Sequence, residues 1–562
     1  MTDASPPDRR WWKDAVVYQI YPRSFNDTTG DGNGDLPGIT EKLDHLAELG
    51  VDVVWLSPVY DSPMHDNGYD IRDYRAINPM FGTMADFDEM LAGMHDRGIR
   101  LLMDLVVNHT SSEHRWFQRS RQSTDDPYRD FYHWRPPAED GGLPTNWRSF
   151  FSGSAWTLDA ATGMYYLHLF DETQPDLNWS TPEVRTAIYD MIRFWLEKGV
   201  DGFRMDVIPL LSKPPFEDLE DPAAGSLHDH YAHGPRIHEY LQEMHDRVLS
   251  DYDVMTVGEG YAIRPDQVND YAGDDDRALQ SFFQFDHVEI GRDDADRHVP
   301  RNWSLPELKA ALTKWDRAFG DEAWPSIFLG NHDLPRAVSY FGDDRPAYRA
   351  RSAKLLATLL LTLRGTPYIY QGDEIGMTNA PFESIDDFRD VETVNDVRER
   401  VAAGADRTTL LERHRALGRD NARTPMQWTD GPNAGFTDGT PWLLVNPNRE
   451  TINVADEWTD PDSVLHYYRR LIALRHQHEV LVYGDYHLLA PEHPTMFAYR
   501  RTLGNERVWV LLNFSDAPET VAWPDEQIVE EPSLLVCTHD ETPSLEDPVS
   551  LRPYEGRVMR VG

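Results

Sequence analysis

The chain has 562 residues, which is too long for one compact core and predicts two to four domains or one large barrel with additions. Its formal net charge is −42, so nucleic acid and anionic membrane surfaces are poor partner candidates. Only 7 of the 54 basic residues are Lys, and the acidic excess is spread along the whole chain. We interpret this composition as an adaptation to a salt-rich cytoplasm, where ions screen self-repulsion; the alternative is an acidic mesophilic protein.

Cys537 is the only cysteine, which excludes an intrachain disulfide and a thiolate metal cluster. Residues 1–14 show no basic segment followed by an apolar run, so no secretory signal is predicted. The longest strongly apolar run, Leu355 to Leu363, is far shorter than the roughly 20 residues that span a bilayer. We therefore expect a cytoplasmic protein with no membrane partner, present as a monomer or a small homo-oligomer.

Apolar strands and amphipathic helices alternate along residues 1–109. The predicted strands are 15–25, 51–58 and 99–109, and the predicted helices are 40–49 and 86–97. Nearly continuous apolar strands are typical of a parallel sheet that is buried on both faces. Residues 110–180 are rich in Pro, Gly, Trp and Asp, and this length without regular pattern predicts a small inserted domain.

The alternation resumes at residue 181 and continues to residue 479. A helix is predicted at 182–198, and strands are predicted at 200–208, 253–258, 281–286, 324–329 and 366–371. Eight strands with intervening helices predict an α/β fold, a (β/α)₈ TIM barrel, whose chemistry lies at the C-terminal strand ends. Residues 376–460 form a long polar loop with some helix over the barrel mouth, 463–477 a helix, and 480–562 a C-terminal antiparallel β domain.

Three acids fall at predicted strand ends. Arg204 and Asp206 project from the same side of a strand, and a neighbouring cation lowers the pKa of a carboxyl, which suits a nucleophile. The alternative is an ordinary buried ion pair. Glu259 follows an apolar strand, where partial burial raises a carboxyl pKa toward that of a general acid, and Asp333 stands beside His332. One ionised and one protonated carboxyl, about 5 to 5.5 Å apart, perform retaining glycoside hydrolysis.

Eight motifs carry a family resemblance. They are YQIYPRSF (18–25), DNGYDI (66–71), DLVVNH (104–109), QPDLNW (174–179), GFRMDV (202–207), GE (258–259), NHD (331–333) and NARTPMQW (421–428). The sequence resembles the α-amylase superfamily, glycoside hydrolase family 13, and within it the α-glucosidase and oligo-1,6-glucosidase group. The resemblance implies that Asp206 is the nucleophile, Glu259 the acid/base and Asp333 the transition-state stabiliser.

The resemblance also implies which residues hold the glucose in the cleavage subsite. They are Asp70, His109, Arg204, His332 and Arg419. Asp70 and Arg419 are expected to close the far side of this subsite, which gives exo attack from the non-reducing end. In this family, Val at the position of Val207 accompanies α-1,6 activity, whereas Thr or Ala accompanies α-1,4 activity. A difference of one methyl or hydroxyl discriminates by only about 1 to 3 kcal/mol.

The loop 27–35 offers oxygen ligands in alternation with small residues. Its candidate metal ligands are Asp27, Thr29, Asp31, Asn33 and Asp35. Such a set suits Ca²⁺, and the loop resembles the metal loop of the oligo-1,6-glucosidase group, although Thr29 replaces the usual Asn. The alternative is a turn that binds no metal. No organic cofactor is expected.

The expected function is therefore a retaining exo-α-glucosidase acting on short α-linked gluco-oligosaccharides, with a leaning toward α-1,6 linkages. The alternatives within enzymes are an α-1,4-preferring maltase with transglucosylation activity, an endo-amylase, a trehalose-6-phosphate hydrolase and a glucosyl transferase or isomerase. The alternative from another class is a non-catalytic sugar-binding or interaction relative.

Overall fold

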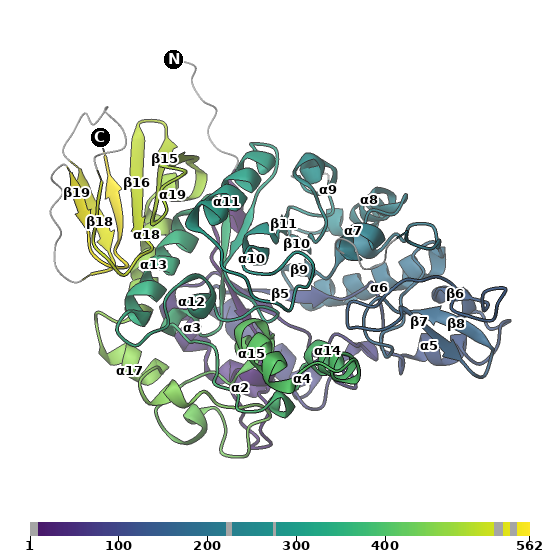
Figure 1. Cartoon of the computed structure of the whole chain (residues 1–562). Helices are drawn as coiled ribbons and strands as arrows, with labels where there is room; N and C mark the ends of the chain where they lie inside the picture. Colours follow the sequence, from purple (N-terminus) through teal and green to yellow (C-terminus); the bar gives the residue numbers. More distant parts are fainter. Residues whose placement is uncertain (1–8, 221–226, 274–276, 522–531, 540–547, 562) are drawn as a thin grey trace.

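The computed structural model describes residues 9–220, 227–273, 277–521, 532–539 and 548–561. Residues 1–8, part of the stretch judged to lack a secretory signal, and parts of the predicted C-terminal domain lie outside the described residues. The core is an eight-stranded parallel sheet in the order β11-β10-β9-β5-β2-β1-β13-β12. Its strands are β1 (Val17–Ile20), β2 (Val53–Leu56), β5 (Arg100–Leu105), β9 (Gly202–Met205), β10 (Met255–Glu259), β11 (Ser281–Phe283), β12 (Ser326–Phe328) and β13 (Thr366–Tyr370). Each predicted strand overlaps one of these, so the α/β barrel is confirmed (Figure 1).

The barrel closes between β11 and β12, which end the hydrogen-bonded strand order. Across this seam the hydroxyls of Ser281 and Ser326 lie 2.7 Å apart and share a hydrogen bond. Among the described strands no backbone ladder joins β11 to β12, whereas every other neighbouring pair has one. The seam is therefore the weakest join in the ring.

Helices surround the strands. The longer ones are α4 (Met84–Asp96), α6 (Pro182–Lys198), α8 (Ile237–Arg247), α11 (Leu305–Phe319), α13 (Arg349–Thr362) and α18 (Val464–Gln477). As predicted, α6 begins at a proline and ends at Gly199, whose φ of +103° few other residues adopt easily. The helical character predicted at 40–49 is confirmed, but the segment is divided between two helices. Lys42, at φ −104° and ψ 8°, separates α2 (Leu36–Glu41) from α3 (Leu43–Leu49).

Two further sheets lie on opposite sides of the barrel (Figure 1). The first contains β6 (Trp134–Arg135), β8 (Met164–Leu167) and β7 (Trp156–Asp159), near α5 (Arg115–Ser120). The second contains β14 (Asp485–Leu489), β15 (Met496–Leu503), β16 (Glu506–Asn513), β20 (Gly556–Arg560) and β18 (Ser533–Cys537), and a pair, β17 (Glu519–Val521) with β19 (Val549–Leu551), accompanies it. All these pairings are antiparallel, and the sheets fall within the ranges 110–180 and 480–562. The domain boundaries themselves stay predictions.

Helices occupy much of the segment 376–460. They are α14 (Val391–Ala402), α15 (Arg407–Leu417), α16 (Asp420–Arg423) and α17 (Val454–Thr459). Side chains of α14 and of the loop after α15 reach the cavity described below. Over the described part of the chain, no helix is both long enough and apolar enough to cross a membrane.

Two buried arginines join the C-terminal sheet to the barrel. Arg501 of β15 donates to the main-chain carbonyls of Thr362, Leu481, Val482 and Gly484. Arg475 of α18 donates to those of Leu361, Leu363, Gly365 and Leu481. Both side chains therefore satisfy carbonyls at the end of α13, which the helix itself leaves unpaired.

Candidate active site

The three predicted acids lie at the C-terminal ends of barrel strands. Asp206 follows β9, Glu259 ends β10, and Asp333 follows β12. They line one cavity of about 70 Å³. The other lining residues are Asp66, Tyr69, His109, Phe150, Phe151, Phe170, Val207, Tyr261, Arg297, Glu392 and Arg419. One water needs about 10 to 15 Å³ on this scale, so the cavity suits one small polar molecule.

Arg204 joins the acids at one end of the cavity. Its Nη1 donates to Asp206 Oδ1 at 2.5 Å and to Asp104 Oδ1 at 2.9 Å. Its Nη2 lies 2.8 Å from Glu259 Oε2, so Asp206 and Glu259 contact the two ends of one guanidinium. Sequence reasoning missed Asp104 as a site residue, although an acid inside an otherwise apolar strand was a signal.

The environment of Asp206 corrects one prediction. Burial raises the pKa of Asp206 well above its ordinary value, Arg204 opposes this rise, and Glu259 and Asp104 add to it. The sequence predicts a lowered pKa for Asp206 because it places Arg204 beside Asp206. It does not show that Glu259 and Asp104 contact the same guanidinium. Coupled carboxyls titrate as a group. Arg204 favours the ionised form of Asp206, which a nucleophile requires.

Val207 turns the chain immediately after Asp206. It adopts φ +39° and ψ 41°, a left-handed conformation that is costly for a β-branched residue. In this conformation its N–H donates to Glu259 Oε2 at 3.1 Å, and its side chain lines the cavity. The strained turn thus links the backbone of one acid to the carboxylate of the other.

Asp333, the third acid of the cavity, lies between two arginines. Its Oδ1 accepts hydrogen bonds from Arg419 Nη1 at 3.1 Å and from Arg423 Nη2 at 2.7 Å. Burial would raise the pKa of Asp333, but the charges of Arg419 and Arg423 outweigh it and hold this pKa well below its usual range. Asp333 is therefore an anion at neutral pH. Arg423 was not singled out, although it stands in the NARTPMQW motif.

The two predicted histidines are buried and neutral. Burial lowers the pKa of His332 to about 3 and that of His109 to about 4. His332 Nδ1 lies 2.8 Å from Gln19 Nε2, and its Nε2 lies 2.7 Å from the Tyr69 hydroxyl. The Gln19 amide can only donate from this atom, so the ring proton is on Nε2. His109 lines the cavity and offers a hydrogen bond without charge, whereas His332 is not among the lining residues and uses both ring nitrogens for Gln19 and Tyr69.

The structure places Asp66, and not Asp70, among the residues that line the cavity. Asp70 is completely buried and accepts hydrogen bonds from the Ser62 hydroxyl and from the backbone N–H groups of His65 and Asp66. It therefore shapes the loop and does not face the cavity. Asp66 lines the cavity, and its Oδ1 lies 3.6 Å from Arg419 Nη2 with no hydrogen-bond donor in reach among the described residues. Burial raises the pKa of Asp66 to about 7.

The predicted metal ligands lie on the loop before α2. Four of them accept hydrogen bonds from neighbouring donors, among them Asp31, whose Oδ1 accepts one from the Asn33 N–H. Asp27 accepts hydrogen bonds from the Gly32 N–H and the Thr437 hydroxyl, Asp35 accepts one from the Gly38 N–H, and Asn33 Oδ1 accepts one from Arg23. Carboxylate, hydroxyl and amide oxygens are the chemistry that Ca²⁺ prefers. The donor set therefore fits, but a cation would have to replace some of these bonds.

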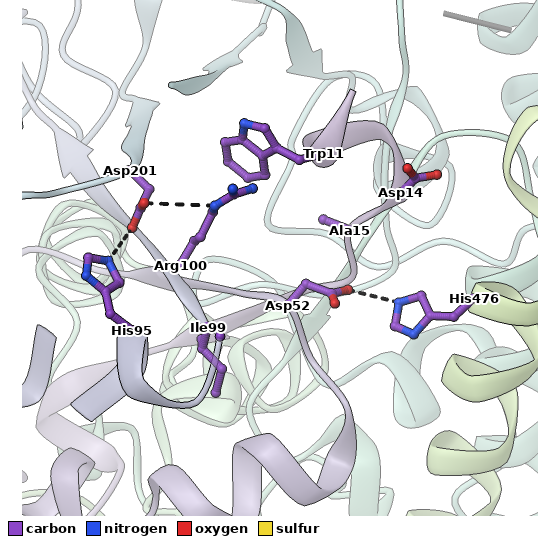
Figure 2. Close-up of a pocket in the computed structure, with 10 residues that line it drawn as sticks. Trp11, Asp14, Ala15, Asp52, His95, Ile99, Arg100, Asp201 and His476 are labelled. Carbon is purple, nitrogen blue, oxygen red and sulfur yellow. Dashed lines mark hydrogen bonds and ion pairs between the residues drawn. The ribbon is translucent and has the colours of Figure 1, made fainter. Parts of the chain in front are cut away.

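A second cavity, of about 580 Å³, opens at the other end of the barrel (Figure 2). There His95 Nε2 lies 2.8 Å from Asp201 Oδ2, and His476 Nε2 lies 3.0 Å from Asp52 Oδ2. The same two carboxylates accept the N–H groups of Leu101 and Val16, which begin β5 and precede β1. This end of such a barrel contributes to stability, and the cavity holds none of the predicted site residues.

A (β/α)₈ barrel with three acids around one small cavity at its C-terminal strand ends is an arrangement that suits a glycoside hydrolase. A family model for the α-amylase catalytic domain matches residues 19–484. The chain is 54% identical over 561 residues to an oligo-1,6-glucosidase of Parageobacillus thermoglucosidasius, which covers 99% of each chain. It is 47% identical to a trehalose-6-phosphate hydrolase of Bacillus subtilis (strain 168), which covers 98% of each.

The structural comparison agrees. An isomaltulose synthase mutant of Erwinia rhapontici, solved with its natural substrate sucrose, has a TM-score of 0.95 and 45% identity, and 99% of each chain is covered. The chain therefore belongs to the α-amylase family, and it is a glycoside hydrolase, as its motifs predicted.

Proposed function

We propose that the chain is a retaining, exo-acting α-glucosidase that releases glucose from the non-reducing end of short α-1,6-linked gluco-oligosaccharides. The observation that carries this proposal is the small size of the cavity, about 70 Å³, which Asp66 and Arg419 line together with Asp206 and Glu259. So small a cavity favours the single sugar at a chain end over the middle of a polymer. The names of the oligo-1,6-glucosidase relatives support the linkage.

The chemistry follows from the geometry. Asp206 Oδ attacks the anomeric carbon while Glu259 gives its proton to the leaving glycosidic oxygen, so one C–O bond forms as another breaks. A water then gives its proton to Glu259 and attacks the glucosyl ester, which frees Asp206 with the α configuration restored. Val207 N–H holds Glu259, and the anion of Asp333 stabilises the positive charge that develops on the ring.

The alternative function, hydrolysis of trehalose 6-phosphate, requires a cationic side chain that can bind the phosphate of the substrate. The two arginines of the cavity already face acids. Arg297 lies 3.7 Å from Glu392 Oε1, and Arg419 Nε lies 3.2 Å from Glu392 Oε2. These pairs favour a neutral glucosyl substrate over a phosphorylated one.

The test uses the purified chain in about 2 M KCl, which shortens the Debye length to about 2 to 3 Å. Isomaltose, maltose, sucrose and trehalose 6-phosphate are supplied in parallel, and products are identified by anomer. We expect the highest kcat/KM for isomaltose, with α-glucose formed first and activity lost in Asp206→Asn. A preference for maltose would overturn the linkage, β-glucose the retaining mechanism, and cleavage of trehalose 6-phosphate alone the neutral substrate.

Three further expectations from the sequence stay proposals. The acidic surface supports a salt-rich cytoplasm as the location and a monomer or small homo-oligomer as the assembly. For the loop 27–35, we propose that Ca²⁺ is held by Asp27, Asp31 and Asp35. Adding Ca²⁺ after chelator treatment should raise the Tm of the wild type and not that of Asp31→Asn. An equal Tm with and without Ca²⁺ would show a turn that binds no metal.

A further inference from the structure

Besides the loop 27–35, a second cluster of side chains that could bind a metal ion lies next to the active-site cavity. His298 belongs to the segment before α11, Asp396 to α14, and His414 to α15. One ligand atom of each lies within 4.8 Å of the other two. Glu392, one turn before Asp396 on α14, brings Oε1 to 3.7 Å from His298 Nε2. Three segments distant in sequence thus direct two imidazoles and two carboxylates to one point.

The spacing of these atoms is close to that of a four-coordinate ion. Zinc binds histidine nitrogen at about 2.0 to 2.1 Å and carboxylate oxygen at about 2.0 to 2.2 Å, which places neighbouring tetrahedral ligands roughly 3.3 to 3.5 Å apart. Here His414 Nε2 lies 3.1 Å from Asp396 Oδ2, and His298 Nε2 lies 3.8 Å from Asp396 Oδ1. The two contacts involve different oxygens of Asp396, so Asp396 either binds the ion through both oxygens or turns to present one of them to both histidines.

We propose that His298, Asp396 and His414, with Glu392 as a fourth ligand, bind a divalent transition-metal ion such as Zn²⁺. Two imidazoles with carboxylates suit Zn²⁺ or Co²⁺, whereas Ca²⁺ and Mg²⁺ prefer an all-oxygen set. The site is therefore chemically distinct from the oxygen-rich loop 27–35.

Arginines compete with the metal ion at two of its ligands, because Arg297 lies 3.7 Å from Glu392 Oε1 and Arg400 pairs with Asp396. Arg400 Nε donates to Asp396 Oδ1 at 2.5 Å, and its two terminal nitrogens each lie 2.8 Å from an oxygen of Asp296. Asp296 therefore keeps the guanidinium neutralised when Asp396 turns to the metal. The release of this bond lowers the affinity but does not leave a buried cation unpaired.

The fourth ligand connects the metal site to catalysis. Glu392 lines the active-site cavity, and its Oε2 lies 3.2 Å from Arg419 Nε. Arg419 in turn donates to Asp333. A metal ion that draws Glu392 toward His298 weakens its hold on Arg419, so we expect bound Zn²⁺ to inhibit hydrolysis. This consequence rests on the proposed function, whereas metal binding does not.

The test titrates the metal-free, full-length chain with Co²⁺ in a non-coordinating buffer that contains Ca²⁺ and KCl. Visible absorption reports tetrahedral Co²⁺, and displacement by Zn²⁺ gives its affinity. We expect one equivalent in the wild type and more than tenfold weaker binding in His298→Gln and in His414→Gln. The side chain of His298 is 16% exposed, so the His298→Gln variant should fold even if the variant at the buried His414 does not. The matched control is His476→Gln, which removes a histidine paired with Asp52 at the far end of the barrel.

Equal Co²⁺ binding in His298→Gln, His414→Gln and His476→Gln would overturn the site, as would no binding by the wild type at millimolar Co²⁺. Hydrolysis of isomaltose is measured separately with and without Zn²⁺. Inhibition in the wild type but not in His298→Gln supports the link through Glu392, and stoichiometric binding without inhibition refutes that link alone. A chain that binds Co²⁺ but cleaves no glucoside would instead overturn the proposed function.

Discussion

Asp66 and Asp70 show how differently two acids of one six-residue motif act. Asp66 presents an oxygen without a hydrogen-bond donor to the cavity, whereas Asp70 accepts three hydrogen bonds inside its own loop. The DNGYDI motif locates the loop, but which acid faces the sugar depends on how the loop folds back at Ser62 and His65. Spacing in sequence does not contain that orientation, so the motif alone does not distinguish Asp66 from Asp70.

The two aspartates should separate in a matched pair of variants. Asp66→Asn removes a charged acceptor from the substrate, and we expect kcat/KM to fall about ten- to a hundredfold with Tm nearly unchanged. Asp70→Asn removes a charged acceptor from the loop, and we expect the free energy of unfolding to fall by about 1 to 3 kcal/mol. Kinetics and thermal melting of both variants are the measurements. The reverse pattern would restore Asp70 as the sugar-binding acid.

Val207 carries the linkage prediction because its side chain lines the cavity beside both acids. Replacing one methyl by a hydroxyl in Val207→Thr should lower the ratio of kcat/KM for isomaltose to that for maltose by about 10- to 200-fold. The replacement keeps β-branching, so the left-handed turn should survive and Tm should stay near that of the wild type. An unchanged ratio would mean that other side chains select the linkage.

At the scale of elements, the strands and their ends were predictable and the loops were not. Apolar runs mark all eight barrel strands, and the acids that end them meet because parallel strands end on one face. Glu392 comes from α14 and Arg297 from an irregular segment, and both belong to the connections after those strands, whose placement over the barrel the strand pattern does not fix. The lowered pKa predicted for Asp206 fails for the same reason, because its other neighbours come from different elements.

The pair formed by His476 and Asp52, near the N-terminal ends of the barrel strands, contributes to stability in a pH-dependent way. Hydrogen bonding to Asp52 raises the pKa of His476, so this pair adds stability below the ordinary histidine pKa of about 6.5 and loses it as pH rises through the folded pKa. His476→Gln should therefore lower Tm at pH 5.5 and have little effect at pH 9. The side chain is 37% exposed, so the shift is small and weaker in 2 M KCl. An equal shift at both pH values would show that the pair contributes through packing.

At the scale of the molecule, the arginine bias has a structural use besides salt tolerance. Arg501 makes five hydrogen bonds to four carbonyls at the junction of barrel and C-terminal sheet. A lysine has only three donors on one atom and cannot reach carbonyls on both sides of a fork. The preference for arginine over lysine therefore fits a chain whose parts are joined by buried cations.

Arg501→Lys should lower the free energy of unfolding by about 2 to 4 kcal/mol because at least two buried carbonyls lose their donors. Arg500→Lys is the matched control, since its side chain points to the other face of β15 and is half-buried. Urea unfolding followed by circular dichroism is the measurement. Equal losses in the two variants would assign the effect to the strand and not to the carbonyl contacts.

Among the described strands, the backbone hydrogen bonding around the barrel is interrupted at the seam between β11 and β12. Asp206 follows β9 and Glu259 ends β10, and these two strands are hydrogen-bonded to each other on one side of the seam. Asp333 follows β12 on the other side. Thermal breathing of the ring concentrates at its weakest join. Such breathing changes the distance from Asp333 to the other two acids and leaves the spacing of nucleophile and proton donor fixed. Heating should therefore erode stabilisation of the charged transition state before it disturbs the geometry of bond exchange.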